Sequence, residues 1–200
     1  MIDELDKTIA ELLKSGLPPE IGDKLTVSFA SPGAEFPPAT LPLPAINLFL
    51  CNLIPNTERR ENAPVVQRLP GGGATKQRPP TYVDCSYLLS VWPDEKSSDP
   101  VAEEHNILGA VMKVLLANPM LPAESLHGSL TDTQTVPVAG KVASPAPKDP
   151  SEVWQSLEAR QKLSLMYTVT FSMPMSDPEE TPLVTEKQLR FRTLGSEELQ

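Results

Sequence analysis

Glycines 71–73 and Lys76 are the residues of this sequence that come nearest to a phosphate-binding loop. Such a loop needs the spacing Gly-x-x-x-x-Gly-Lys-Ser/Thr between a strand and a helix, because its backbone amides and its lysine must surround the phosphates. That spacing is missing here, no strand runs directly into the glycines, and no helix follows them. The glycine run therefore favours a flexible linker over a nucleotide site.

His105 and His127 are the only histidines, and they are the first candidates for metal ligands. A histidine pair on one helix face needs the second ligand four residues later, but Gly109 occupies that position. His127 precedes Gly128 in a predicted loop. We therefore expect a partly exposed helix residue and a loop residue, with no metal and no other cofactor.

Cys51 and Cys85 lie on strands that we predict to be neighbours. A catalytic cysteine needs a nearby base, and small apolar thiols more often pack in a core. We expect free, buried thiols. Asp84, in the middle of a predicted strand, is either solvated on the sheet face or paired with one of Arg59, Arg60 and Arg78.

Two tryptophans could anchor an interface, although packing at the core or its edge is the commoner role for this side chain. They are Trp92 and Trp154. No combination of residues in the sequence supports acid–base, nucleophilic or metal chemistry. The residues thus favour a binding or structural protein over an enzyme.

The balance of acidic and basic residues also limits the classes of partner that we expect. The chain has 26 acidic and 17 basic residues, a net charge of −9, which disfavours nonspecific binding to nucleic acid. No apolar stretch approaches the roughly 20 residues that span a bilayer, and the first residues lack the features of a signal peptide. We therefore expect assembly in the cytoplasm without membrane insertion.

Periodicity and breakers predict a series of helices and strands. The 23 prolines against 10 glycines indicate stiff, extended connections between these elements. Alternation predicts strands, and apolar residues at helical spacing predict helices. The predicted helices are 2–15, 101–118 and one beginning at Pro150, and the predicted strands are 25–29, 45–53, 82–92 and 163–173.

These elements predict an α+β fold with a single mixed, mainly antiparallel sheet and helices packed on one face. We expect one domain over residues 1–175, interrupted by a long mobile loop at 58–80. Residues 176–200 are predicted to be a linker and an extended arm, in which Leu189 and Phe191 alternate with Arg190 and Arg192.

The order of several segments carries further information. An Arg-Pro-Pro sequence leads into a strand, a Glu-Glu-His-x-x-Leu-Gly helix follows, and a Trp-x-x-Leu segment precedes the last strong strand. In this chain these segments are 78–92, 103–112, 118–121, 153–157 and 162–169. Over residues 3–176 the chain resembles the cap proteins of extracellular contractile injection systems, of the antifeeding prophage and Photorhabdus virulence cassette type.

This resemblance implies a fold and a function. The fold would be that of phage tail terminators, and the function would be to close the sheath and inner tube at the end away from the baseplate, as a hexameric ring. The implied partners are the chain itself, the sheath protein and the inner tube protein, in a particle that can be released from the cell. The alternative is an adaptor or tail-completion protein that links the particle to a membrane or another component.

The candidate interface residues follow from exposure to such partners. We expect the basic residues around the long loop and the alternating residues of the arm to make the contacts, with the arm adding a strand to a neighbouring sheet. We expect the long loop to become ordered on docking. These candidates are Arg59, Arg60, Arg78, Val184, Leu189, Arg190, Phe191 and Arg192.

Overall fold

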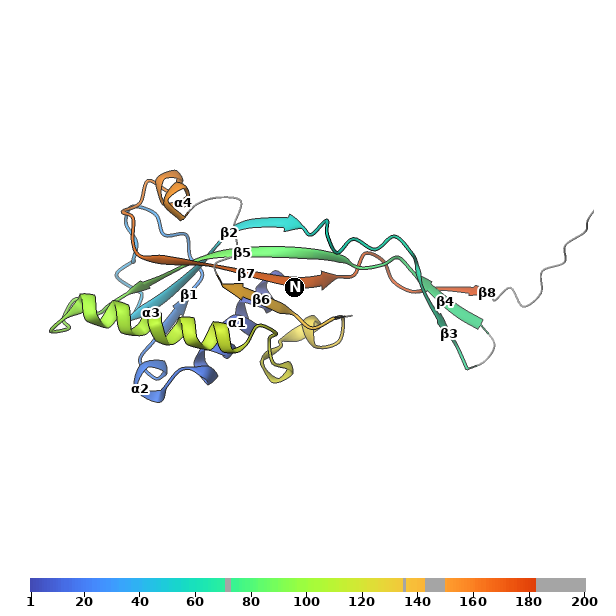
Figure 1. Cartoon of the computed structure of the whole chain (residues 1–200), viewed down its shortest axis with the longest axis horizontal. Helices are drawn as coiled ribbons and strands as arrows, with labels where there is room; N and C mark the ends of the chain where they lie inside the picture. The colour runs from blue at the N-terminus through green and yellow to red at the C-terminus, as the bar shows by residue number, and fades with distance from the viewer. Residues whose placement is uncertain (71–72, 135, 143–149, 183–200) are drawn as a thin grey trace, which may run out of the picture. The chain divides into compact units, whose positions relative to one another are not determined.

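The computed structural model describes residues 1–70, 73–134, 136–142 and 150–182 (Figure 1). The chain divides into two compact units. The first consists of Met1–Glu61 and Pro80–Met175, and the second of Asn62–Pro79 and Ser176–Gln200.

The first unit is built on a five-stranded sheet with the order β1-β2-β5-β7-β6. β1 runs parallel to β2, and the other neighbours are antiparallel. This arrangement confirms the predicted α+β class and its mixed, mainly antiparallel sheet. The strands are β1 (Thr26–Ser28), β2 (Ala45–Pro55), β5 (Thr81–Trp92), β6 (Ala139–Val142) and β7 (Ser164–Met173).

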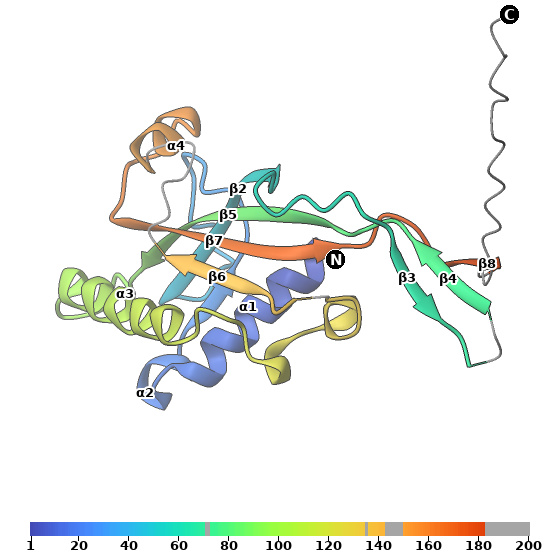
Figure 2. The same ribbon diagram turned by 45° about the vertical axis from the view of Figure 1, so that its right-hand side comes forward.

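Two long helices cover one face of this sheet, as Figure 2 shows. They are α1 (Ile2–Gly16) and α3 (Pro100–Ala117), and the four-residue α2 (Pro19–Gly22) follows α1. Odd-numbered residues of β5 such as Tyr87 and Leu89 point into this core, as their alternation predicts. Gly16 lets the helices approach closely, because a Cβ there would lie 2.6 Å from Val114 Cγ1.

The opposite face of the sheet is covered by a short helix, α4 (Pro150–Ser156). Val153 and Trp154 of α4 pack on Leu88 and Met166 in a second cluster of buried residues. The predicted one-sided packing therefore holds for α1 and α3 but not for α4. The reason is that Leu88 of β5 and Met166 of β7 place apolar side chains on the second face, and these also have to be shielded from water.

Two short 3-10 helices connect α3 to β6. They are η1 (Ala123–Ser125) and η2 (Gly128–Thr131). Both contact α1: Thr8 Oγ1 accepts a hydrogen bond from the backbone N–H of His127, and Glu4 accepts one from the Ser129 hydroxyl at 2.5 Å. The connection thus closes one end of the main core.

The second unit contains a three-stranded antiparallel sheet with the order β3-β4-β8. Its strands are β3 (Val65–Arg68), β4 (Gly73–Gln77) and β8 (Glu179–Pro182). The long loop expected at 58–80 therefore holds two strands, and the linker expected before Pro182 holds a third. Each strand is too short to show alternation, and each is specified by pairing with segments distant in the sequence, Lys76 opposite Glu179 for example.

Candidate protein-binding surfaces

The basic candidates are exposed and belong to different units. Arg59 and Arg60 follow the end of β2 in the first unit, where the backbone N–H of Arg59 donates to Asn56 Oδ1 at 3.0 Å. Arg78 lies in the second unit, and its backbone N–H donates to Ser176 Oγ at 3.3 Å. The guanidinium groups are thus available to partners. The remaining candidates, Val184, Leu189, Arg190, Phe191 and Arg192, lie outside the described residues.

Asp84 braces the sheet. Its carboxylate accepts hydrogen bonds from Asn56 Nδ2 at 3.0 and 3.2 Å and from Thr170 Oγ1 at 2.6 Å. These bonds tie β5 to β7 and to the residue that follows β2. The arginine pairing considered from the sequence is therefore replaced by two neutral partners, Thr170 on β7 and Asn56 after β2, and the half-buried Asp84 side chain keeps part of its surface in water.

The two cysteines lie on the paired strands β2 and β5, as predicted, and neither forms a disulfide. Cys85 is buried, and desolvation, with smaller contributions from Asp6 and Asp84, raises the pKa of its thiol to about 12. Such a thiol stays protonated and is a poor nucleophile. Cys51 is half-buried and donates to the carbonyl of Ser86 at 3.3 Å.

Within the described ranges, no three side chains of histidine, cysteine, aspartate or glutamate come together as metal ligands would. His105 is exposed on α3, and His127 lies at the start of η2. A separate property concerns membranes: over the same ranges, no helix has both the length and the apolar character needed to cross one.

The Asp6–Tyr87 pair is a polar contact between α1 and the sheet, in which Tyr87 is buried and Asp6 is half-buried. The Tyr87 hydroxyl donates to Asp6 Oδ1 at 2.8 Å. Burial raises the pKa of Asp6, and the hydrogen bond from Tyr87 opposes this effect. Burial and the nearby Asp6 charge likewise raise the pKa of Tyr87, which therefore keeps its proton and acts as a hydrogen-bond donor.

Replacing Asp6 with asparagine tests this pair. The pKa of Asp6 in the folded state lies above its ordinary value of 3.8. The stability that protonated Asp6 contributes is therefore fully present below pH 3.8, and it is lost as the pH rises through the folded-state pKa. Asparagine keeps the acceptor and removes the buried charge. We expect Asp6→Asn to unfold with a free energy at pH 7 at least equal to wild type, and with a smaller loss of stability above pH 4.

The measurement is urea unfolding between pH 3 and 7. Glu11→Gln, which removes an exposed carboxylate from the same helix, is the control and should follow the wild-type profile. A wild-type profile for Asp6→Asn as well would show that the Asp6 carboxylate is not destabilised by burial.

The tryptophans divide between two environments. Trp154 is buried against the sheet, and its Nε1 donates to Ser164 Oγ at 3.2 Å. Trp92 is half-buried and makes an edge contact with Phe36, with ring centroids 4.9 Å apart. Lys162 Nζ lies 4.7 Å from the Trp92 ring centroid. Both tryptophans therefore serve packing within the chain.

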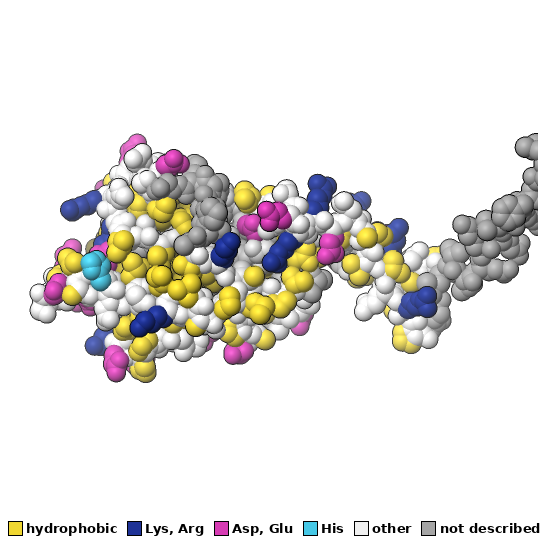
Figure 3. All heavy atoms as spheres, viewed as in Figure 1, with side chains coloured by type: hydrophobic (Ala, Val, Ile, Leu, Met, Phe, Trp, Pro, Cys, Tyr) yellow, Lys and Arg dark blue, Asp and Glu magenta, His cyan; other side chains and the backbone are white. Residues whose placement is uncertain are grey.

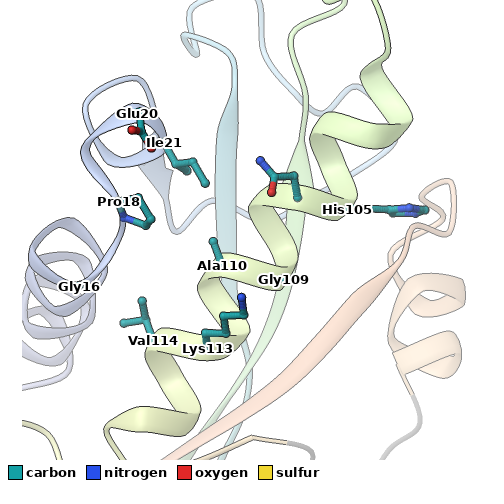
Figure 4. A pocket seen from close by; sticks show the side chains of 10 residues that line it. Gly16, Pro18, Glu20, Ile21, His105, Gly109, Ala110, Lys113 and Val114 are labelled. Carbon is teal, nitrogen blue, oxygen red and sulfur yellow. The ribbon is translucent and has the colours of Figure 1, made fainter.

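A groove runs between the α1–α2 turn and α3 (Figure 4). It encloses about 610 Å³ and is lined by small residues and a few polar groups. Figure 4 shows Ala110 and Val114 on the side of α3 that faces Pro18, and His105 also lines the groove. Its ionisable side chains, Glu20, His105 and Lys113, do not meet at one point in Figure 4, which suits contact with a protein surface better than catalysis on a small substrate.

Comparison with known proteins agrees with these features. The chain matches one chain of the cryo-EM structure of an extracellular contractile injection system, the PVC sheath/tube terminator in the extended state. The TM-score is 0.68 at 18% identity, over 98% of this chain and 65% of that one. It also matches the anti-feeding prophage cap, a tube-terminating cap, with a TM-score of 0.63 at 18% identity, over 96% of this chain and 61% of that one. This chain thus spans less than two thirds of either relative, and no curated protein matches it.

The fold is therefore that of the terminator proteins of contractile injection systems. The sequence identifies the family more narrowly, since the sequence model of the Pvc16 N-terminal domain matches residues 4–186. The chain belongs to the Pvc16 N-terminal domain family, which confirms the resemblance seen in the segment order.

Proposed function

We propose that this protein is a structural cap that terminates the sheath and inner tube at the baseplate-distal end of a contractile injection system. The observation that carries this proposal is the match of 98% of the chain to a sheath/tube terminator, together with the family assignment. The cap acts as a hexameric ring. A ring of identical subunits needs a contact between two different surfaces of each subunit, repeated by rotation until it closes.

The partners follow from that role. They are further copies of this chain, the sheath protein and the inner tube protein, and the cap assembles in the cytoplasm on a particle that is later released. The role is not enzymatic, which agrees with the raised pKa of Cys85 and the neutral partners of Asp84. The net charge of −9 supports the expectation that nucleic acid is not a partner.

Two sets of candidate residues serve the contacts to sheath and tube in this proposal. The exposed guanidinium groups of Arg59, Arg60 and Arg78 are suited to carboxylates on a partner, which arginine binds bidentately. The segment 184–192 offers alternating apolar and basic residues that could pair with a sheet edge. Both assignments are part of the proposal.

Removing the protein from the producing cell tests the function. We expect particles with tubes of uncontrolled length or frayed ends, because polymerisation of tube and sheath then has no terminator. Electron microscopy of purified particles measures the length distribution, and expression of the wild-type chain in the same cells should restore it. Particles of normal length and intact ends without the protein would reject the cap function.

A further inference from the structure

The outer face of α3 is apolar although the helix packs its other side into the core. Ile107, Val111 and Leu115 are buried against the sheet. A helix that is hydrophobic all round is ordinarily covered on all sides. On the outer face, residues at spacings of four, four, three and four form a stripe, the α3 outer stripe: Val101, His105, Gly109, Met112 and Leu116.

The apolar members of the α3 outer stripe are well exposed. Val101 is 63% exposed, Met112 40% and Leu116 55%. Figure 3 shows hydrophobic side chains gathered on the face of the first unit where α3 lies in Figure 1. The spacing is the one by which a helix presents a seam to a partner.

Gly109 marks the middle of the stripe. A glycine inside a helix costs about 1 kcal/mol relative to alanine, so it needs a packing reason. The described residues supply no such reason, because a Cβ at Gly109 would meet none of their atoms within 4 Å. A glycine at this place allows the backbone of another chain to approach the helix closely.

The charge beside the stripe identifies the occupant. Both carboxylates of α3 are half-buried and engaged: Glu103 accepts the backbone N–H of Asp94 at 3.1 Å, and Glu104 pairs with Lys162 at 2.9 Å. The ionised side chain exposed on this helix is Lys113. The first unit as a whole carries 20 acidic and 11 basic residues, a net charge of −9. An apolar stripe flanked by the exposed Lys113 is complementary to the acidic remainder of the first unit on another copy.

The contact joins two different surfaces. Packing two α3 stripes against each other would bring their Lys113 side chains together in a desolvated interface, which like charges disfavour. Packing the stripe on an acidic surface of the next copy avoids that repulsion. Contacts of this kind, between different patches, are those that close into rings.

We propose that the α3 outer stripe is the surface on which a second copy of this chain docks, through a different and acidic surface of that copy. This inference deepens the proposed cap function, since it supplies the subunit contact of the ring. Self-association through this surface can be measured whether or not the protein caps a particle.

The first test places a photo-crosslinking residue at Leu116 of the full chain. The protein is irradiated at increasing concentrations in solution and, separately, in assembled particles. We expect an adduct with twice the 21.8 kDa mass of the chain, whose second attachment site maps by mass spectrometry outside α3. Adducts solely to another protein, adducts that join two α3 helices, or no adduct in either sample would overturn the proposal.

The second test compares Leu116→Glu with Leu53→Glu. The two leucines are 55% and 47% exposed, so both variants should keep the wild-type circular dichroism and thermal unfolding. Sedimentation should show self-association weakened about tenfold or more for Leu116→Glu, because its carboxylate would be buried in the contact. Leu53→Glu should associate as the wild type does. Equal association of both variants would overturn the inference.

The two proposals fail in distinguishable ways. Particles made without the protein could be normal while the crosslink from position 116 still joins two copies. That result would support the self-association contact and reject the cap function. If the particles are overlong without the protein but Leu116→Glu associates and caps normally, the function stands and this contact falls.

Discussion

Replacing Trp154 with alanine should lower the free energy of unfolding by about 3–5 kcal/mol, the usual range for removing a buried tryptophan. Trp154 is 1% exposed and fills the space between α4 and the sheet, against Leu88 and Met166. The loss combines the apolar area returned to water with a cavity that the short helix α4 cannot close. Urea unfolding followed by far-UV circular dichroism measures the change without relying on tryptophan fluorescence.

Leu163→Ala is the matched control for Trp154→Ala. Leu163 lies next to β7 and is 52% exposed, so its truncation should change stability by about 0.5 kcal/mol or less. If both variants unfolded at the same urea concentration, α4 would not be held to the sheet by Trp154. The second core cluster would then contribute little to stability.

Gly140→Ala should destabilise the fold by about 2–3 kcal/mol through overpacking. Gly140 lies in the edge strand β6, against the side chain of Tyr167 on β7. A Cβ at this position would lie 2.8 Å from Tyr167 Cζ and overlap the hydroxyl oxygen. The Tyr167 ring is fully buried and cannot swing away, so the strain has to fall on β6. Thermal unfolding by calorimetry measures the effect.

A double-mutant cycle separates this collision from a general cost of alanine in the strand. The Tyr167 hydroxyl has no hydrogen-bond partner among the described residues, so Tyr167→Phe should change stability by about 1 kcal/mol or less. In the Tyr167→Phe background the alanine should cost about 1 kcal/mol less than in the wild type. Equal costs in the two backgrounds would show that the Tyr167 hydroxyl is not what Gly140 accommodates.

The long elements were predictable because each carries its own signal. The helix beginning at Ile2 and the strands ending at Trp92 and Met173 have clear apolar periodicity, and their observed bounds agree with it. Of the short strands, β1 was predicted from its alternation, but the other four carried no such signal. β6 has four residues, and β3, β4 and β8 have four or five each, so pairing partners decide whether they form.

The candidate interface was predicted only in part. Exposure of Arg59, Arg60 and Arg78 agrees with their proposed role, but basic residues near a loop do not reveal which surface is apolar and uncovered. The sequence did not predict the α3 outer stripe, because Met112 and Leu116 are residue types that usually pack in the core of an apolar helix. Only the packed structure shows that they face away from the sheet.

By itself, the sequence determined the α+β class, the main helices and strands, and the family. These features follow from local apolar periodicity and from the order of segments, both of which can be read without the tertiary structure. The tertiary structure alone decided that 62–79 joins the segment after Met175 in a second sheet, that α4 covers the other face, and that α3 keeps an apolar side uncovered. The physical reason is that these features depend on pairing and burial between residues far apart in the sequence, which no local pattern encodes.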